Sequence, residues 1–206
     1  MTTKFLGIGT GRCGTKSLMA VINSCQNCKA THEAFLTPWE SVDIKELLNW
    51  FTAHEKYNLI ALGDISLNNL PKIVPLRKKI PNLKVVHIWR NKEQVAKSFI
   101  KAHQNISRIL PQSKKLANWH STRMIRYWPG LHPLAGSGSI FPAIDANSVI
   151  DSYRKYWDYY MKRAAELENV YLMNIEELNI RKGLDRLFDY LEIPEEARCY
   201  KKFRIR

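Results

Sequence analysis

Short apolar runs alternate along the chain with longer segments in which apolar positions recur every three or four residues. The short runs predict buried strands over 5–8, 58–62, 84–89 and 170–173. The helical spacing predicts helices over 17–25, 44–51, 92–102, 148–167 and 184–191, with a short proline-broken helix over 69–79. This alternation predicts a three-layer α/β/α fold, in which helices cover both faces of a central parallel sheet.

The stretch 105–147 interrupts the alternation. Neither a helical nor a strand period persists there, and residues 129–142 read PGLHPLAGSGSIFP, a composition typical of a loop. Long loops in compact domains are usually functional. We therefore predict one domain over 1–206 with a loop-rich insertion around 105–147, which would form a lid or a substrate wall.

Composition narrows the choice of partners. The 206 residues are 45% hydrophobic and 25% charged, which is a globular balance. The net charge of +13 indicates an anionic ligand or surface. The first residues do not resemble a signal peptide, and no apolar stretch is long enough to span a membrane. Four cysteines are too few for a secreted disulfide scaffold, so we expect a cytoplasmic protein.

The motif that most clearly indicates a binding site is GTGRCGTKS, residues 9–17, between the first predicted strand and helix. A glycine-rich turn at this place exposes backbone N–H groups, and the helix N-terminus adds partial positive charge. Arg12 and Lys16 add full charges. Together these features predict a cradle for phosphate or sulfate, because a turn that binds nothing has no need of the two cations.

Two nucleotide motifs come close to this sequence without matching it fully. Gly9 and Gly14 have the spacing of a Walker A loop, but Thr15 stands where that loop has its lysine. Gly9, Gly11 and Gly14 fit the dinucleotide pattern G-x-G-x-x-G, although the acidic residue expected about 20 positions later is not found at the end of a second strand. The dinucleotide interpretation stays open at this point.

GTGRCGTKSL resembles the 5′-phosphosulfate loop of the sulfotransferases that use 3′-phosphoadenosine 5′-phosphosulfate (PAPS). A second element, KVVHIWRNKEQVAKS, places Arg90 at a strand end and Ser98 eight positions later in the next helix, as in the 3′-phosphate motif of that family. NVYLMNIEELN and GLDRLFDYLEIP look like its late strand and final helix. The resemblance covers most of 4–194 apart from 105–147. It implies a P-loop-like fold and sulfuryl transfer from PAPS to a hydroxyl or amine, without a metal.

The resemblance also implies roles for individual residues. Arg12 would stabilise the negative charge that develops near the bridging oxygen, and its role would be electrostatic because a guanidinium keeps its proton. Arg90 and Ser98 would hold the 3′-phosphate. The remaining contacts with the donor would come from the loop residues Gly11, Cys13, Gly14, Thr15, Lys16 and Ser17. For the Cys13 thiol itself we favour packing.

The acceptor needs a base that removes its proton. Glu33 lies 21 positions after Arg12, and tyrosylprotein sulfotransferases are similar in placing a catalytic glutamate about this far beyond their loop arginine. His32 is the second candidate. Both residues also have structural interpretations, in which Glu33 caps or forms an ion pair and His32 packs on the sheet.

The chain departs from the family in two places. Many members have a lysine in a Gly-Asp-Lys-Ser pattern, but residues 63–66 read GDIS, so we assign Asp64 or Ser66 to the acceptor or to the orientation of Arg12. The late glycine-rich nucleotide loop is not evident, and the basic tail at Lys201, Lys202 and Arg204 either replaces its charge or is solvated. Trp119 and His132 in the insertion are acceptor candidates by location.

Two other functions compete with sulfuryl transfer. A P-loop kinase would need a magnesium-binding aspartate after a core strand, for which Asp64 is the obvious candidate. A nucleic-acid binder would explain the charge, but lysines and arginines are spread along the chain and no such motif emerges. Cys25 and Cys28 have metal-ligand spacing without a second pair, so we predict no zinc site. The acceptor class, whether glycan, lipid, peptide or small alcohol, stays open.

Overall fold

The computed structural model describes residues 2–39, 41–109, 141, 142, 144, 146 and 148–200. Within them, five parallel strands form one sheet in the order β2-β3-β1-β4-β5. The strands are β1 (Thr3–Ile8), β2 (Cys28–His32), β3 (Ala61–Ile65), β4 (Lys84–Trp89) and β5 (Val170–Asn174). The strand order reverses at β1, and open parallel sheets bind their ligands beyond the carboxyl ends of the strands at such a point.

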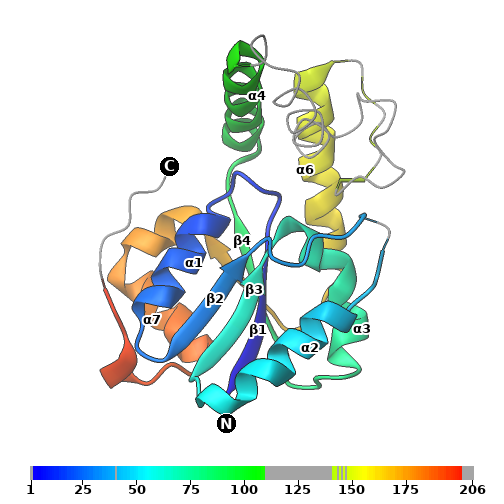
Figure 1. Cartoon of the computed structure of the whole chain (residues 1–206). Coiled ribbons are helices and arrows are strands. Elements are labelled where there is room, and N and C mark those ends of the chain that lie inside the picture. Colours follow the sequence, from blue (N-terminus) through cyan, green and yellow to red (C-terminus); the bar gives the residue numbers. More distant parts are fainter. Residues whose placement is uncertain are drawn as a thin grey trace.

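Helices cover both faces of the sheet, which confirms the three-layer prediction. One face carries α1 (Thr15–Ser24) and α7 (Arg181–Tyr190), and the other carries α2 (Lys45–His54) and α3 (Ile73–Arg77) (Figure 1). Beyond the carboxyl edge, α4 (Lys92–Ile109) and α6 (Val149–Ala165) stand side by side (Figure 1). The 3₁₀ segments are η1 (Glu55–Tyr57), η2 (Leu67–Lys72), η4 (Ile175–Asn179) and η5 (Glu195–Ala197).

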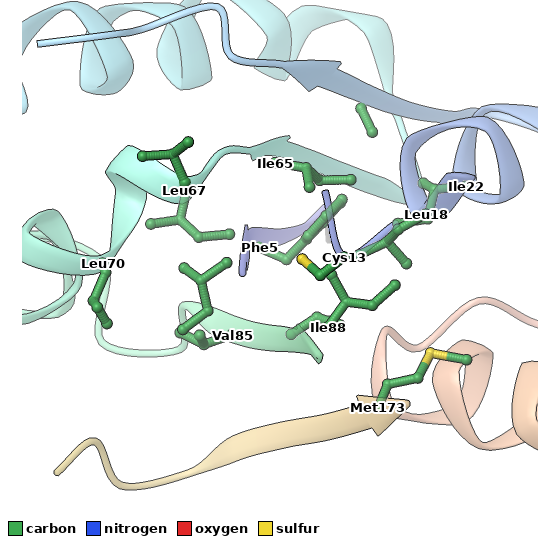
Figure 2. Close-up of a cluster of buried hydrophobic side chains, with 14 of the residues drawn as sticks. Phe5, Cys13, Leu18, Ile22, Ile65, Leu67, Leu70, Val85, Ile88 and Met173 are labelled. Carbon is green, nitrogen blue, oxygen red and sulfur yellow. The ribbon is translucent and has the colours of Figure 1, made fainter. Parts of the chain in front are cut away.

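The core lies on either side of the central strand β1. Phe5 is completely buried, because a central strand of a parallel sheet is covered on both faces. Figure 2 shows Leu18 and Ile22 of α1 in one cluster with Ile88 of β4, and the Cys13 side chain lies among them. The turn before α1 is therefore packed onto the sheet by its own thiol and by the helix that follows it.

The sequence pattern does not predict β2, and it places β3 three residues too early. β2 reads CKATH and has only Ala30 fully buried, so it lacks the apolar run that marks the inner strands. Asn23 of α1 compensates by pairing with Ala30, since its Nδ2 donates to the carbonyl at 2.9 Å and its Oδ1 accepts from the N–H at 2.6 Å. In β3, the buried Gly63 and Asp64 hide the strand from a hydrophobicity pattern.

The boundary predicted for the helix after β4 is wrong, because α4 continues to Ile109 rather than ending at residue 102. The first residues of the predicted 105–147 insertion are thus helical. Ile106 and Ile109 continue the spacing of the preceding apolar residues, but the polar residues between them conceal it. Residues 110–140 lie outside the described part of the chain. Among the helices that the structure does describe, none has both the length and the apolarity needed to cross a membrane.

Candidate functional site

The turn between β1 and α1 has the backbone of an anion cradle. Gly11 and Gly14 have φ angles of 76° and 102°, in the left-handed region that favours glycine. Arg12, between them, has φ 55°, which few residues with a side chain adopt. A β-carbon added to Gly14 would lie 2.6 Å from Ile175 Cδ1, so only glycine fits at the point where the turn meets η4. The turn is shaped by its glycines as the motif predicts.

The N-terminus of α1 lacks the usual capping groups. Gly14 is its N-cap and offers no side chain, and the first turn contains no acidic residue. The earliest helical hydrogen bond runs from Leu18 N to Gly14 O at 2.9 Å. The amides before it have no partner inside the helix, and an anion is a natural partner for them. They belong to Thr15, Lys16 and Ser17.

The floor of the cradle is fixed by two buried groups. The Tyr160 hydroxyl accepts a hydrogen bond from Gly9 N at 3.0 Å and donates one to Leu67 O at 3.0 Å. It thereby joins the turn to the start of η2. The Cys13 side chain is fully buried, and burial raises the pKa of its thiol to about 11. Cys13 thus stays protonated and acts as a packing group, so only its backbone is available to bind an anion in the cradle.

The two motifs singled out in the sequence meet in space. Arg12 Nε donates a hydrogen bond to Ser98 Oγ of α4 at 3.1 Å. Arg90 lies one residue beyond the end of β4, where its Nε donates to Gln94 Oε1 at 3.0 Å. Its carbonyl accepts a hydrogen bond from Trp157 Nε1 at 3.0 Å, which ties this corner to α6. The structure thus brings Arg12 and Ser98 into direct contact at the carboxyl edge of the sheet.

Three cations lie at the carboxyl edge of the sheet. Arg12, Lys16 and Arg90 form no ion pair with a carboxylate in the part of the chain that the structure describes. Other cations nearby are neutralised, as Arg154 is by Glu93 across α6 and α4 at 2.6 Å. Cations that are held near exposed amides without a protein counter-ion favour a bound anion.

The two candidate bases follow one another at the end of β2. His32 Nε2 lies 2.9 Å from Thr15 Oγ1, so the ring contacts the first residue of α1. Glu33 Oε2 lies 3.9 Å from His32 Nδ1. Burial is the main cause that lowers the pKa of His32, with Lys16 acting in the same direction and Glu33 and Asp64 opposing it. The neutral ring is therefore favoured in the folded chain.

Two acceptor candidates, Asp64 near the end of β3 and Ser66 directly after it, are bonded within the protein. Asp64 is fully buried, and its Oδ1 accepts from Thr31 Oγ1 at 2.7 Å and from Ala34 N at 3.3 Å. Its Oδ2 accepts from Asn69 Nδ2 at 3.0 Å. Ser66 Oγ accepts from the N–H of Asn68 at 3.1 Å. Among the described contacts, neither side chain is hydrogen-bonded to Arg12.

Several residues around the site are not found by motif matching. Asn68, Asn69 and Lys72 are buried polar residues in η2, and Tyr160 lies on an aromatic stripe that reads as plain core. A lysine and two asparagines within an otherwise apolar stretch are the only sequence signal for the first three.

Some predicted residues lie outside the described part of the chain, namely Trp119, His132, Lys201, Lys202 and Arg204. Within the described part, no group of three or more histidine, cysteine, aspartate or glutamate side chains is arranged to hold a metal ion.

A family model and solved structures of other proteins are similar to this chain. The family model described as "Sulfotransferase domain" matches residues 2–204. The sulfotransferase domain from the curacin biosynthetic pathway is similar in fold, with a TM-score of 0.51 at 12% identity over 100% of this chain and 80% of that chain. Mouse sulfotransferase SULT7A1 complexed with PAP gives a TM-score of 0.49 at 17% identity over 93% of this chain. This chain spans 60% of the length of the mouse structure. No curated protein matches.

Proposed function

Because the chain belongs to the sulfotransferase domain family, we propose that it transfers a sulfuryl group from PAPS to a hydroxyl or amine of an acceptor. The observation that carries this proposal is the hydrogen bond between Arg12 and Ser98, which places the two anion-binding motifs next to each other. One nucleotide with phosphate groups at both its 3′ and 5′ positions can then contact both. A nucleotide that is charged at only one end would leave one motif unused.

The two ends of the donor bind to different elements in this scheme. Arg90 and Ser98 bind the 3′-phosphate, for which the planar guanidinium offers two parallel N–H donors. The 5′ end lies over the N-terminus of α1, where unpaired amides and the helix dipole favour negative charge. Its contacts come from Gly11, Arg12, Gly14, Thr15, Lys16 and Ser17, together with the backbone of Cys13.

Sulfuryl transfer is an in-line displacement. The acceptor oxygen or nitrogen forms a bond to sulfur while the bond from sulfur to the bridging phosphate oxygen breaks, and PAP leaves with that oxygen. Negative charge grows on the leaving oxygen during this step. Arg12, held by Ser98 and without a carboxylate partner among the described residues, is the group that stabilises this charge more in the transition state than in the ground state.

The acceptor proton goes to Glu33 in this scheme. The side chain of Glu33 is 32% exposed, whereas that of His32 is 11% exposed. His32 Nε2 is also already engaged with Thr15 Oγ1. Glu33 therefore has the more accessible proton acceptor, and the neutral His32 ring is suited to lie between Glu33 and the cradle.

The remaining assignments are part of the same proposal. Trp119 and His132 from the insertion contact the acceptor, while the burial and internal bonds of Asp64 and Ser66 favour a role in holding the chain around the site. We propose one domain over the whole chain. A cytoplasmic location is part of the proposal, and it is supported by the low number of cysteines, since four are too few for a secreted disulfide scaffold.

The test is transfer from PAPS labelled with sulfur-35. The protein is incubated with labelled PAPS and, separately, with a phenol, a tyrosyl peptide, a glycan and a lipid alcohol, and labelled product and PAP are quantified. We expect one class to accept the label with matching release of PAP. Phosphoryl transfer from ATP with Mg²⁺ to the same acceptors, without transfer from PAPS, would overturn the proposal in favour of a kinase.

A further inference from the structure

The segment that follows β2, residues 33–37, is tied down by buried polar side chains of η2. The Asn68 Oδ1 atom accepts two hydrogen bonds from Thr37, one from its N–H at 2.9 Å and one from its hydroxyl at 3.0 Å. Lys72 Nζ donates a hydrogen bond to the carbonyl oxygen of Phe35. Asn68 and Lys72 are 0% and 1% exposed, so all three hydrogen bonds start from side chains that lie inside the protein. Two successive parts of the segment are therefore fixed from the same side.

The start of the segment is held in the same way by β3. The N–H of Glu33 donates to Ile65 O at 3.1 Å, and the N–H of Ala34 donates to Asp64 Oδ1 at 3.3 Å. Together with the contacts of Asn68 and Lys72, these bonds give the segment an anchor at nearly every residue. Such dense anchoring is unusual for a connection between two elements, since loops are commonly the more mobile parts of a fold.

Lys72 is a poor choice for stability alone. Its ammonium group is buried, and among the described residues it forms no ion pair and makes a single hydrogen bond, to a backbone carbonyl. Burial lowers its pKa, which the more distant charges of Asp64, Asp43 and Glu46 oppose. A buried cation loses its hydration, and an apolar side chain of similar volume is often neutral or stabilising at such a place. We therefore look for the role of Lys72 in the segment that it binds through the Phe35 carbonyl.

Lys72 binds the chain two residues after Glu33, through the carbonyl of Phe35. Glu33 has φ 54°, a left-handed conformation that is strained for a residue with a side chain. Such a conformation persists only when the surrounding structure enforces it. The anchors on residues 34–37 prevent the segment from relaxing toward an ordinary extended path, which would turn the Glu33 carboxylate away from His32.

We propose that Lys72 and Asn68 are positioning residues for the transfer reaction, which hold residues 35–37 and so keep the Glu33 carboxylate at the cradle. This inference rests on the proposed function and adds to it two residues outside the donor and acceptor contacts. Neither residue touches the donor in this scheme, so their loss affects turnover and leaves donor binding intact.

The experiment compares Lys72→Met with Leu76→Met. Both positions are buried and lie within five residues of each other, but the apolar side chain of Leu76 cannot form a hydrogen bond, so the second variant controls for a methionine in this part of the core. We measure kcat and KM for PAPS with the acceptor found by the label-transfer assay, and hydrogen exchange at the amides of Ala34 and Thr37. For Lys72→Met we expect kcat to fall at least tenfold, KM for PAPS to stay within twofold, and exchange at Thr37 to rise at least tenfold. Leu76→Met should match the wild type.

Thr37→Val is a second, milder variant in case Lys72→Met does not fold. It removes the hydroxyl bond to Asn68 and keeps the volume, and a threefold or larger fall in kcat with unchanged KM for PAPS would support the proposal. Full kcat in a folded Lys72→Met protein, or in Thr37→Val if only that variant folds, would overturn the positioning role and leave the proposed function standing. If the wild type transfers no label to any acceptor, the proposed function itself fails, and this inference fails with it.

Discussion

Arg12 and Ser98 are 86 residues apart in the sequence, and in the folded chain Arg12 Nε donates a hydrogen bond to Ser98 Oγ at 3.1 Å. The contact follows from the strand order, because β1 and β4 are neighbours and each leads directly into the turn or helix that carries one of the two residues. In the proposed scheme, this contact joins two motifs that are separate in sequence into one continuous site for the donor.

Replacing Arg12 with alanine should reduce turnover much more than donor binding. Removing a preorganised donor from a developing oxyanion typically lowers kcat by about 10²–10³-fold. Arg163→Ala is a suitable control, because this arginine lies on the exposed end of α6 and pairs only with Glu166 among the described carboxylates. Label transfer from PAPS measures kcat, and calorimetry measures the Kd of PAP. Equal kcat values in the two variants would refute the role of Arg12.

Glu33→Gln should lower kcat by about 10²-fold, since general-base catalysis contributes roughly 10²–10⁴-fold. The Kd of PAP should not change, because Glu33 contacts no donor group in the scheme. His32→Asn serves as the comparison, and we expect a smaller fall in kcat, since the ring is buried and bonded to Thr15. A Glu33→Gln protein with full turnover would reject Glu33 as the base.

Tyr160→Phe should destabilise the fold and loosen the cradle. The variant leaves Gly9 N–H and Leu67 C=O without their shared hydroxyl, and an unsatisfied buried polar group costs about 1–3 kcal/mol. Tyr159→Phe is the matched control, because among the described contacts that hydroxyl accepts one long hydrogen bond of 3.4 Å, from Arg163. Urea unfolding should show the difference in the free energy of unfolding. If both variants are equally stable, the bridge between the turn and η2 is energetically unimportant.

Stability should decrease between neutral and mildly acidic pH because of His87. This residue is 3% exposed, its Nε2 has no hydrogen-bond partner among the described residues, and burial lowers its pKa from 6.5 to about 4. The unfolded chain therefore binds a proton between pH 6.5 and 4 that the folded chain resists, and the free energy of unfolding falls as pH is lowered through this range. The full effect is about 3 kcal/mol, from 1.36 kcal/mol per pKa unit.

Urea unfolding at pH 7 and pH 5 checks this prediction with His87→Phe. The variant should lose part of the pH dependence, while the remainder comes from groups that both proteins share, including His32, whose pKa is shifted in the same direction. An identical pH dependence in the two proteins would show that His87 does not cause the acid sensitivity.

The sequence predicts the parts of the fold that depend on local pattern. β4 is predicted at its observed bounds because KVVHIW is rich in β-branched and aromatic residues, and the glycine turn is predicted because its glycines and cations are visible without any tertiary information. β2 is not predicted because Ala30 is its only buried residue, and because the backbone of Ala30 is paired with Asn23, a residue of another element.

The supporting groups of the site are equally hard to predict. Asn68 and Lys72 look like surface residues until η2 is folded under residues 33–37, and Tyr160 looks like core until its hydroxyl is seen between two backbone groups. Sequence motifs identify residues that are expected to contact the ligand. The residues that position those groups do so through contacts between distant elements, which one sequence does not reveal.

The central claim, that one nucleotide is bound at both its 3′ and 5′ ends, is tested most directly by calorimetry with PAP and with adenosine 5′-monophosphate. The two ligands differ only in the 3′-phosphate, and charge-assisted hydrogen bonds of this kind contribute about 1.5–3 kcal/mol each. We expect PAP to bind at least tenfold more tightly to the wild type, without added metal, and this preference to disappear in Arg90→Ala. Equal affinity of the wild type for the two nucleotides would contradict the account.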